Sequence, residues 1–402
     1  MVSNNHKITK KVAWIVQFPN IIYVNIFNSL TKLYPEIEFT MIVGNEQKER
    51  MKGVKFKVQY LKKYQKIFRL IFVPIVILRF LIGKRDTEIT SLTYFKGMGK
   101  FLKKYDPDVV AANVYYRPAT WQAAWHCKKT NTPLILNTEI KQFPKDPFAK
   151  FLVKLTFKIL KKMFEQSRFI LSWTRKGEEF GKQYFPVTNK SKIHTLLAGV
   201  DTEIFKKVKV KRDRNKIIKL LIVARLISYK RHNDLLNALH HLKTNYPDVK
   251  FELGILGSGP LKENIESSII SLNLTNEVKF LNRVPYSEIN KVYCSHDILV
   301  LPSYNEAIGM VVPEAMACGL PVIVSDTCGA VDYVDNNKNG YIFKTADHID
   351  LAKKILQLRE KKKRDLFGKL SQKLIQEKYG VDSIAKQFYG FIEKSFCEKD
   401  SK

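Results

Sequence analysis

Residues 301–343 read LPSYNEAIGMVVPEAMACGLPVIVSDTCGAVDYVDNNKNGYIF, and this stretch decides the fold. The apolar run Ile298–Leu301 before it predicts a buried strand that ends in a loop of small and polar residues. Pro313–Ala317 predicts a short helix that ends at Gly319, and Leu320–Val324 predicts a second buried strand. This order places the loop at the carboxyl end of a strand, where open α/β sheets bind ligands.

Two carboxylates mark this stretch. Glu306 lies in the loop, and Glu314 lies in the first turn of the predicted helix, where backbone N–H groups are unpaired. A diphosphate could accept those N–H groups while the carboxylates accept hydrogen bonds from sugar hydroxyls. Taken alone, Glu314 also fits a residue that only stabilises the helix, and Glu306 also fits a solvated loop acid.

The length and composition of the chain limit the class of protein to which it can belong. A length of 402 residues favours two domains, and a composition of 45% hydrophobic and 27% charged residues is globular. No apolar segment of a secretory signal follows Met1, and the five cysteines are scattered, so we expect a reduced, cytoplasmic protein. Neither the cysteines nor the eight histidines are grouped at ligand spacing, so we expect no metal.

The net charge of +31 is unevenly distributed. Residues 1–200 contain 36 Lys and Arg against 13 Asp and Glu, a balance of +23. Such a half implies an anionic partner: nucleic acid, an anionic membrane surface or an acidic substrate. A codon bias toward lysine explains a general excess but not this asymmetry.

Two segments are candidates for contact with a membrane. Residues 67–83 contain nine consecutive uncharged residues, too few to span a bilayer but enough to lie in its interface. A buried helix or an insertion in the first domain is the competing interpretation. Phe148–Phe164 predicts one basic amphipathic helix, whose apolar side we expect to pack on the sheet while its lysines face solvent or lipid headgroups.

Both halves of the chain alternate strands and helices. The order strand, helix, strand at residues 12–16, 21–34 and 39–43 predicts a parallel sheet in the first half. After the charged linker Lys206–Lys219 the alternation restarts, and Val381–Phe396 predicts a last amphipathic helix. Further strands are predicted at residues 109–113, 133–137, 169–172, 192–197, 220–223, 251–256, 278–281 and 297–301.

Basic and glycine-rich loops precede the acidic stretch. Arg225 and Lys230 follow a predicted strand, and a guanidinium and an ammonium together suit a departing diphosphate. Gly257-Ser258-Gly259-Pro260 follows the next strand and could let backbone approach a phosphate or ribose. Each signal alone is weak, because basic loop residues are common here and the glycines lack the spacing of a dinucleotide fingerprint.

The order of these motifs, continued by Asn339-Gly340, resembles the donor-binding domain of retaining GT-B glycosyltransferases, the large glycosyltransferase family four. The resemblance implies an α/β protein with two Rossmann-like domains, parallel sheets facing across a cleft. We expect an acceptor-side domain at residues 1–205 and a donor-binding domain at residues 206–380. The last helix, at about residues 381–398, is expected to pack back on the first domain.

The resemblance also implies roles for single residues. Arg225 and Lys230 would hold the diphosphate, and Glu306 would contact the donor sugar; these three form the predicted catalytic set. Glu314 would bind the ribose, and Gly309 and Met310 would offer backbone N–H groups. The predicted donor-binding residues are Gly257, Gly259, Arg283, Ala307, Ile308, Gly309, Met310 and Glu314. No cofactor or metal is implied, since the nucleotide-sugar is a substrate.

The chain departs from the family at several positions. Ala224 and Asn282 replace frequent glycines, and Phe18-Pro19-Asn20 replaces a glycine-rich loop. The histidine common near position 138 is missing, and Asn137, Thr138 and Glu139 lie in its neighbourhood. Asn20 and Glu139 are therefore our candidates on the acceptor side.

The expected function is retaining transfer of a hexose or N-acetylhexosamine from a UDP- or GDP-sugar to a glycan or lipid-linked acceptor. We expect it to serve cell-surface polysaccharide or glycoconjugate synthesis, peripherally on the inner face of the cytoplasmic membrane. The alternative is a basic protein that binds nucleic acid or membrane on an inactive transferase fold. No recognisable module interleaves basic residues with aromatic ones, so we expect no nucleic-acid partner.

Overall fold

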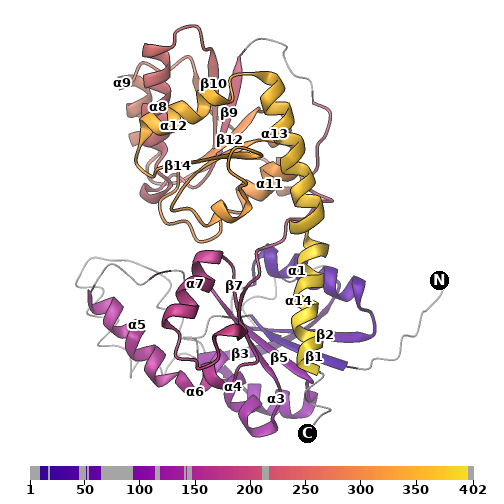
Figure 1. Ribbon diagram of the computed structural model, residues 1–402. Helices are drawn as coiled ribbons and strands as arrows, with labels where there is room; N and C mark the ends of the chain where they lie inside the picture. The colour runs from indigo at the N-terminus through magenta and orange to yellow at the C-terminus, as the bar shows by residue number, and fades with distance from the viewer. Residues whose placement is uncertain are drawn as a thin grey trace, which may run out of the picture. The chain divides into compact units, whose positions relative to one another are not determined.

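The computed structural model describes residues 10–16, 19–44, 51, 54–64, 94–113, 118–139, 142, 147–210 and 217–396 (Figure 1). Contacts within the chain divide it into two compact units. Unit 1 comprises Met1–Leu197 and Ile384–Lys402, and unit 2 comprises Ala198–Ser383. Each unit is built around its own sheet.

Unit 2 contains a six-stranded sheet with the order β11-β10-β9-β12-β13-β14, in which every pairing is parallel. Numbered along the chain, this is the doubly wound order 3-2-1-4-5-6, which reverses direction between β9 and β12. The strands are β9 (Ile218–Val223), β10 (Phe251–Leu256), β11 (Val278–Phe280), β12 (Ile298–Leu301), β13 (Val322–Ser325) and β14 (Gly340–Phe343). The loops after β9 and β12 therefore meet at the switch point.

Helices cover both faces of this sheet. Helices α8 and α12 contact each other on one side, and α11 contacts α13 on the other (Figure 1). The α-helices are α8 (His232–Asn245), α9 (Lys262–Ser271), α10 (Ile289–Cys294), α11 (Val311–Ala317), α12 (His348–Gln357) and α13 (Lys361–Leu374). Short turns of other helix types are η5 (Ser228–Lys230), η6 (Tyr286–Glu288), η7 (Gly329–Tyr333) and η8 (Ile375–Tyr379).

Unit 1 contains an eight-stranded sheet with the order β4-β3-β2-β1-β5-β6-β7-β8. Only the edge pair of β3 and β4 is antiparallel. The strands are β1 (Lys10–Ile15), β2 (Ile37–Gly44), β3 (Lys57–Tyr64), β4 (Tyr94–Lys96), β5 (Val109–Asn113), β6 (Leu134–Thr138), β7 (Phe169–Ser172) and β8 (Ile193–Thr195). The switch point of this sheet lies between β1 and β5.

Strand β1 shows how unit 1 forms two cores. Trp14 packs on one face, with its ring centroid 4.9 Å from that of Phe27 in α1 (Ile21–Leu33) and 4.6 Å from that of Phe388 in α14 (Val381–Phe396). Its neighbours Ala13 and Ile15 belong to the core of the other face. The remaining helices are α3 (Met98–Tyr105), α4 (Pro118–Thr130), α5 (Pro147–Ile159), α6 (Lys161–Gln166), α7 (Arg175–Tyr184) and η4 (Lys190–Lys192).

Several predicted elements are confirmed at their bounds, among them β7, β10 and α14. The single helix predicted at residues 148–164 is wrong: α5 ends at Ile159, and α6 starts at Lys161. Apolar periodicity continues through the break, because Leu160 is buried like its neighbours Phe157 and Phe164. The apolar residues 67–83 lie outside the described residues. Within the described part of the chain, no helix has the length and hydrophobicity needed to cross a bilayer.

Candidate functional site

An ion pair joins the two loops at the switch point of unit 2. The Lys230 ammonium, at the end of η5 after β9, donates to the Glu306 carboxylate in the loop after β12. The side chains are only 11% and 17% exposed. The backbones are joined as well, since the Tyr304 amide donates to the Tyr229 carbonyl at 2.7 Å. The sheet therefore unites two residues that lie 76 positions apart in the chain.

A tight turn directs Lys230 into the site. The next residue, Arg231, has a left-handed φ of +53°, and its guanidinium Nη2 donates to Asp234 Oδ1 at 2.9 Å. This contact holds the strained turn against the first turn of α8. Arg225 in the same loop is exposed, so the site presents one enclosed cation and one accessible cation.

The loop that contains Glu306 is anchored by a glycine that sequence reasoning missed. The Gly329 amide donates to the Glu306 carbonyl at 2.9 Å, and a Cβ at Gly329 would lie 1.9 Å from the Ala307 carbonyl oxygen. Gly309 has φ +74°, which residues with a side chain rarely adopt. In this loop Ala307 is exposed, whereas Ile308 and Met310 are half-buried. The TCGA sequence around Gly329 carries no signal that would have identified it.

Gly257 and Gly259 lie where the loop after β10 packs against the loop after β9. A Cβ at Gly257 would lie 1.8 Å from the Ala224 carbonyl oxygen, and one at Gly259 would lie 2.5 Å from that of Leu226. The Leu226 amide also donates to the Ser258 carbonyl at 3.0 Å. The glycines thus allow the two loops to pack backbone against backbone, which positions the segment that contains Arg225.

Glu314 is buried on α11, with 8% of its surface exposed. The Tyr293 hydroxyl donates to its Oε2 at 2.7 Å. Burial raises the pKa of Glu314 to about 7, against the opposing effect of this hydrogen bond. The second acid of the stretch is therefore an interior carboxylate rather than a surface helix-stabilising one. Arg283, also predicted in this site, is exposed after β11.

The corresponding edge of unit 1 carries amides and aromatic groups. Asn113, at the end of β5, accepts from Trp14 Nε1 at 2.7 Å and from Asn137 Nδ2 at 2.9 Å, both through Oδ1. Two donors on one oxygen fix the amide orientation. The candidates Asn20 and Glu139 both contact Tyr23: Asn20 Oδ1 accepts from its amide, and Glu139 Oε1 accepts from its hydroxyl at 3.3 Å.

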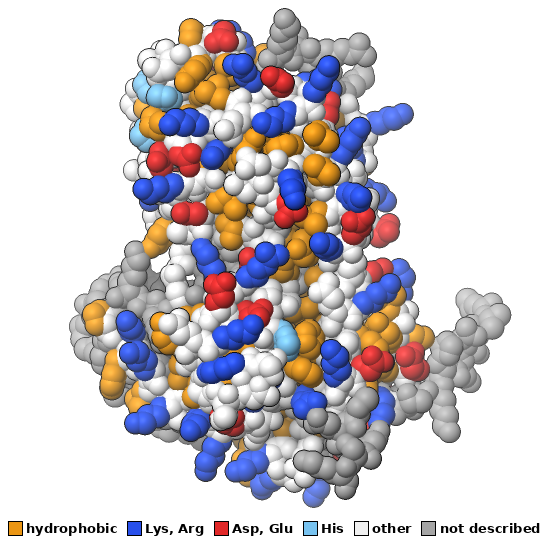
Figure 2. All heavy atoms as spheres, viewed as in Figure 1, with side chains coloured by type: hydrophobic (Ala, Val, Ile, Leu, Met, Phe, Trp, Pro, Cys, Tyr) orange, Lys and Arg blue, Asp and Glu red, His pale blue; other side chains and the backbone are white. Residues whose placement is uncertain are grey.

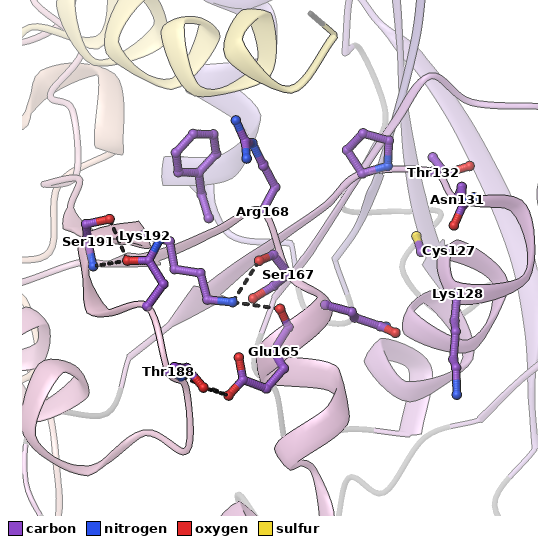
Figure 3. Close-up of a pocket in the computed structure, with 14 residues that line it drawn as sticks. Cys127, Lys128, Asn131, Thr132, Glu165, Ser167, Arg168, Thr188, Ser191 and Lys192 are labelled. Carbon is purple, nitrogen blue, oxygen red and sulfur yellow. Dashed lines mark hydrogen bonds between the residues drawn. The ribbon is translucent and has the colours of Figure 1, made fainter. Parts of the chain in front are cut away.

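The large cavity in Figure 3 lies at the opposite, amino edge of strands β6, β7 and β8 in unit 1. Its volume is about 1050 Å³. Its polar groups largely satisfy one another: Lys192 Nζ donates to three backbone carbonyls, and Thr188 donates twice to Glu165. None of the predicted site residues lines it. In the described part of the chain, no cluster of three or more His, Cys, Asp or Glu could hold a metal ion.

Comparison with known proteins identifies relatives by sequence. The model of the family described as "Glycosyl transferases group 1" matches residues 201–380. An uncharacterized glycosyltransferase of Haemophilus influenzae is 30% identical over 263 residues, which are 61% of this chain and 72% of that protein.

Solved structures match over nearly the whole chain. A glycosyltransferase from Rickettsia africae superposes with a TM-score of 0.74 at 15% identity, covering 96% of this chain and 98% of that one. HepE of Anabaena in complex with UDP-glucose gives a TM-score of 0.67 at 15% identity, covering 96% of this chain and all of that one. At this identity the likeness concerns the fold.

Proposed function

Because the chain belongs to the glycosyl transferases of group 1, we propose that it moves a hexose or N-acetylhexosamine from a UDP- or GDP-sugar to a glycan or lipid-linked acceptor. It is a glycosyltransferase with the GT-B fold, of two doubly wound α/β domains. The observation that carries the proposal is the enclosed Lys230–Glu306 pair at the switch point of unit 2. Doubly wound sheets bind ligands at that point.

The residues of the site fit the parts of a nucleotide-sugar. Lys230 and Arg225 stabilise the diphosphate, where negative charge grows as the glycosidic bond breaks. Glu306 accepts hydrogen bonds from the donor sugar, and its pairing with Lys230 keeps both side chains in place before the substrate binds. Backbone amides of residues 307–310 contact the diphosphate or sugar, and Glu314 accepts from the ribose. These cations let the reaction proceed without a metal.

Transfer proceeds with retention of the anomeric configuration. The acceptor hydroxyl attacks the anomeric carbon from the face that the nucleotide leaves, and its proton passes to the departing phosphate oxygen. On the acceptor side, Asn20 and Glu139 contact the incoming hydroxyl group or its sugar. Their common contact with Tyr23 supports a joint role, because it holds both residues at the same edge of the sheet.

A thermal-shift screen of UDP, GDP and their sugars tests the donor assignment. A ligand at 100 times its Kd stabilises the folded state by about 2.7 kcal/mol, so the true donor raises the unfolding midpoint by several degrees. The nucleotide-sugar that raises the unfolding midpoint is then supplied with candidate acceptors, and NMR of the product reports its anomeric configuration. No stabilisation by any nucleotide-sugar refutes the donor assignment, and an inverted product refutes retention.

We also propose that unit 1 binds an anionic membrane, which places the enzyme on the inner, cytoplasmic face, in cell-surface polysaccharide or glycoconjugate synthesis. Helix α5 supports this proposal: Phe151 and Leu155, one turn apart, are 59% and 40% exposed. Lys154 and Lys158 are exposed on the same helix, and Figure 2 shows basic side chains beside apolar ones over α5. Apolar anchors flanked by lysines are typical of helices that lie in a lipid interface.

Flotation with vesicles of phosphatidylcholine alone, or mixed with phosphatidylglycerol, tests this docking. The protein should float with the anionic vesicles only, and Phe151→Ser with Leu155→Ser should abolish flotation. Ile270→Ser is the matched control, since Ile270 is 68% exposed on α9 of unit 2. Equal flotation of all variants, or flotation of none, contradicts docking through α5.

A further inference from the structure

We propose that Tyr293 is a positioning residue that orients Glu314 and favours its ionised form, so that this carboxylate recognises the ribose diol of the donor nucleotide. The inference rests on the proposed function, since it takes the donor to be a nucleotide-sugar. It goes beyond that function in assigning a role to Tyr293 and in predicting how donor recognition depends on pH.

The geometry supports this role. Tyr293 lies in the last turn of a short helix, α10, and none of its surface is exposed. Its hydroxyl meets Glu314 Oε2 at 2.7 Å, an ordinary distance for a strong O–H···O hydrogen bond. Helices α10 and α11 pack against each other, so both partners are held by the interior. The bond uses Oε2, whereas Oε1 can accept up to two further hydrogen bonds.

A vicinal diol can donate the hydrogen bonds that the Glu314 carboxylate can still accept. Two adjacent hydroxyls donate to an ionised carboxylate, whereas a protonated acid loses acceptor capacity and presents a proton of its own. Replacing the diol with a single hydroxyl removes one hydrogen bond to a charged, buried acceptor. Glu314 in the ionised form is therefore suited to distinguish a ribonucleotide from a 2′-deoxyribonucleotide.

The surroundings make Tyr293 necessary for that ionised form. Burial disfavours the charge on Glu314, and the Tyr293 hydrogen bond favours it. Among the described residues, Tyr286 of η6 and Cys318 at the end of α11 also interact electrostatically with Glu314. Burial raises the pKa of Tyr286, and contact with Cys294 together with burial raises that of Cys318, so both are neutral around pH 7. Loss of the hydroxyl therefore leaves the carboxyl protonated at neutral pH.

Titration of donor binding tests the proposal. The Kd of the nucleotide-sugar that stabilises the wild type is measured between pH 5.5 and 9.5, for the ribose form and its 2′-deoxy analogue. A nucleotide-sugar is the proper probe, because its esterified phosphates do not titrate in this range. Wild-type affinity should rise through about pH 7. Tyr293→Phe should bind about tenfold more weakly at pH 7, recover above pH 9, and discriminate against the deoxy form only at high pH.

Tyr333→Phe is the matched control. Tyr333 is 1% exposed in the same unit, but its hydroxyl donates to the Ala198 carbonyl at 2.8 Å. It should lower thermal stability and leave the pH profile unchanged. Glu314→Gln covers the case in which Tyr293→Phe does not fold, and its affinity should not vary with pH.

The outcomes separate this inference from the proposed function. A wild type that binds no nucleotide-sugar overturns both. A wild type that binds, with Tyr293→Phe showing the same pH profile or a loss that high pH does not restore, overturns the positioning role alone. If Glu314→Gln keeps the pH profile of the wild type, the positioning role is overturned as well.

Discussion

The carboxyl edges of the two sheets differ in chemistry although both lie at a switch point. In unit 2 the edge is charged, with Lys230 and Glu306 paired in an enclosed position. In unit 1 its centre is built from neutral groups, with Asn113 accepting from Trp14 and Asn137, and Glu139 lies beside them. The charged edge belongs to the less basic half of the chain, since residues 1–200 hold +23 of the net charge.

This difference separates two uses of positive charge. A few cations placed by unit 2 suit a diphosphate, which needs fixed groups at short range. The lysines of unit 1 are spread over helices such as α5, where they suit a broad anionic surface. The edge of unit 1, with its amides and the single acid Glu139, suits the uncharged, hydroxyl-rich acceptor that we propose. Net charge is therefore highest in the unit for which we propose membrane docking, and not in the unit for which we propose donor binding.

The largest expected effect is on Lys230. Lys230→Ala removes an enclosed cation from the proposed diphosphate site and breaks its ion pair with Glu306, so kcat should fall about 10²- to 10³-fold. Steady-state kinetics and the unfolding midpoint are measured together. Lys243→Ala is the control, because Lys243 pairs with Glu277 at 2.8 Å in the same unit but away from the switch point. Equal activity in both variants would remove the distinction between the two edges.

Two glycines test how tightly each unit is built. Gly257→Ala in unit 2 places a Cβ 1.8 Å from the Ala224 carbonyl, and backbone cannot move aside as a side chain can. We expect a loss of about 3 kcal/mol in stability together with loss of donor binding. Gly390→Ala in α14 of unit 1 meets no atom within 4 Å and should stabilise the protein by about 0.5–1 kcal/mol. Urea unfolding measures both, and a neutral Gly257→Ala contradicts the packing described for unit 2.

Acid should weaken unit 2 through His232. Burial, and to a smaller extent the charge of Lys230, lower the pKa of His232 to about 4 from its usual value of 6.5. The folded state thus favours the neutral ring. The stability that this preference contributes is fully present above pH 6.5 and is lost as the pH falls toward 4. The total is about 3 kcal/mol, at about 1.4 kcal/mol per pKa unit. Urea midpoints between pH 7 and 4 should fall less steeply for His232→Gln, and parallel curves would refute the assignment.

The smallest effect on activity concerns the edge of unit 1 at which we propose that the acceptor binds. Glu139→Gln keeps the size of the side chain but removes its charge, so transfer should fall about tenfold while the donor Kd stays the same. Glu165→Gln is the control, since Glu165 lines the cavity at the opposite edge. Full transfer by Glu139→Gln would mean that this residue has no acceptor-side role.

The sequence predicted elements best where strands are buried on both faces. The bounds of β7 and β10 follow from apolar runs that end in polar or glycine residues. Strand β3, KVQYLKKY, escaped prediction because four of its eight residues are Lys or Gln. It forms only because β2 and β4 flank it with hydrogen-bond partners. Helix α3 likewise has lysines on a short amphipathic segment that periodicity alone did not reveal.

The sequence by itself determined that the chain alternates strands and helices, and that its second half carries two cations, a glycine loop and two acids, in that order. Only the tertiary structure decided that Lys230 pairs with Glu306, that Gly329 anchors their loop and that Tyr293 holds Glu314. The physical reason is that strand order in a sheet is independent of order in the chain. Contacts between loops far apart in sequence therefore arise only when β9 and β12 become neighbours.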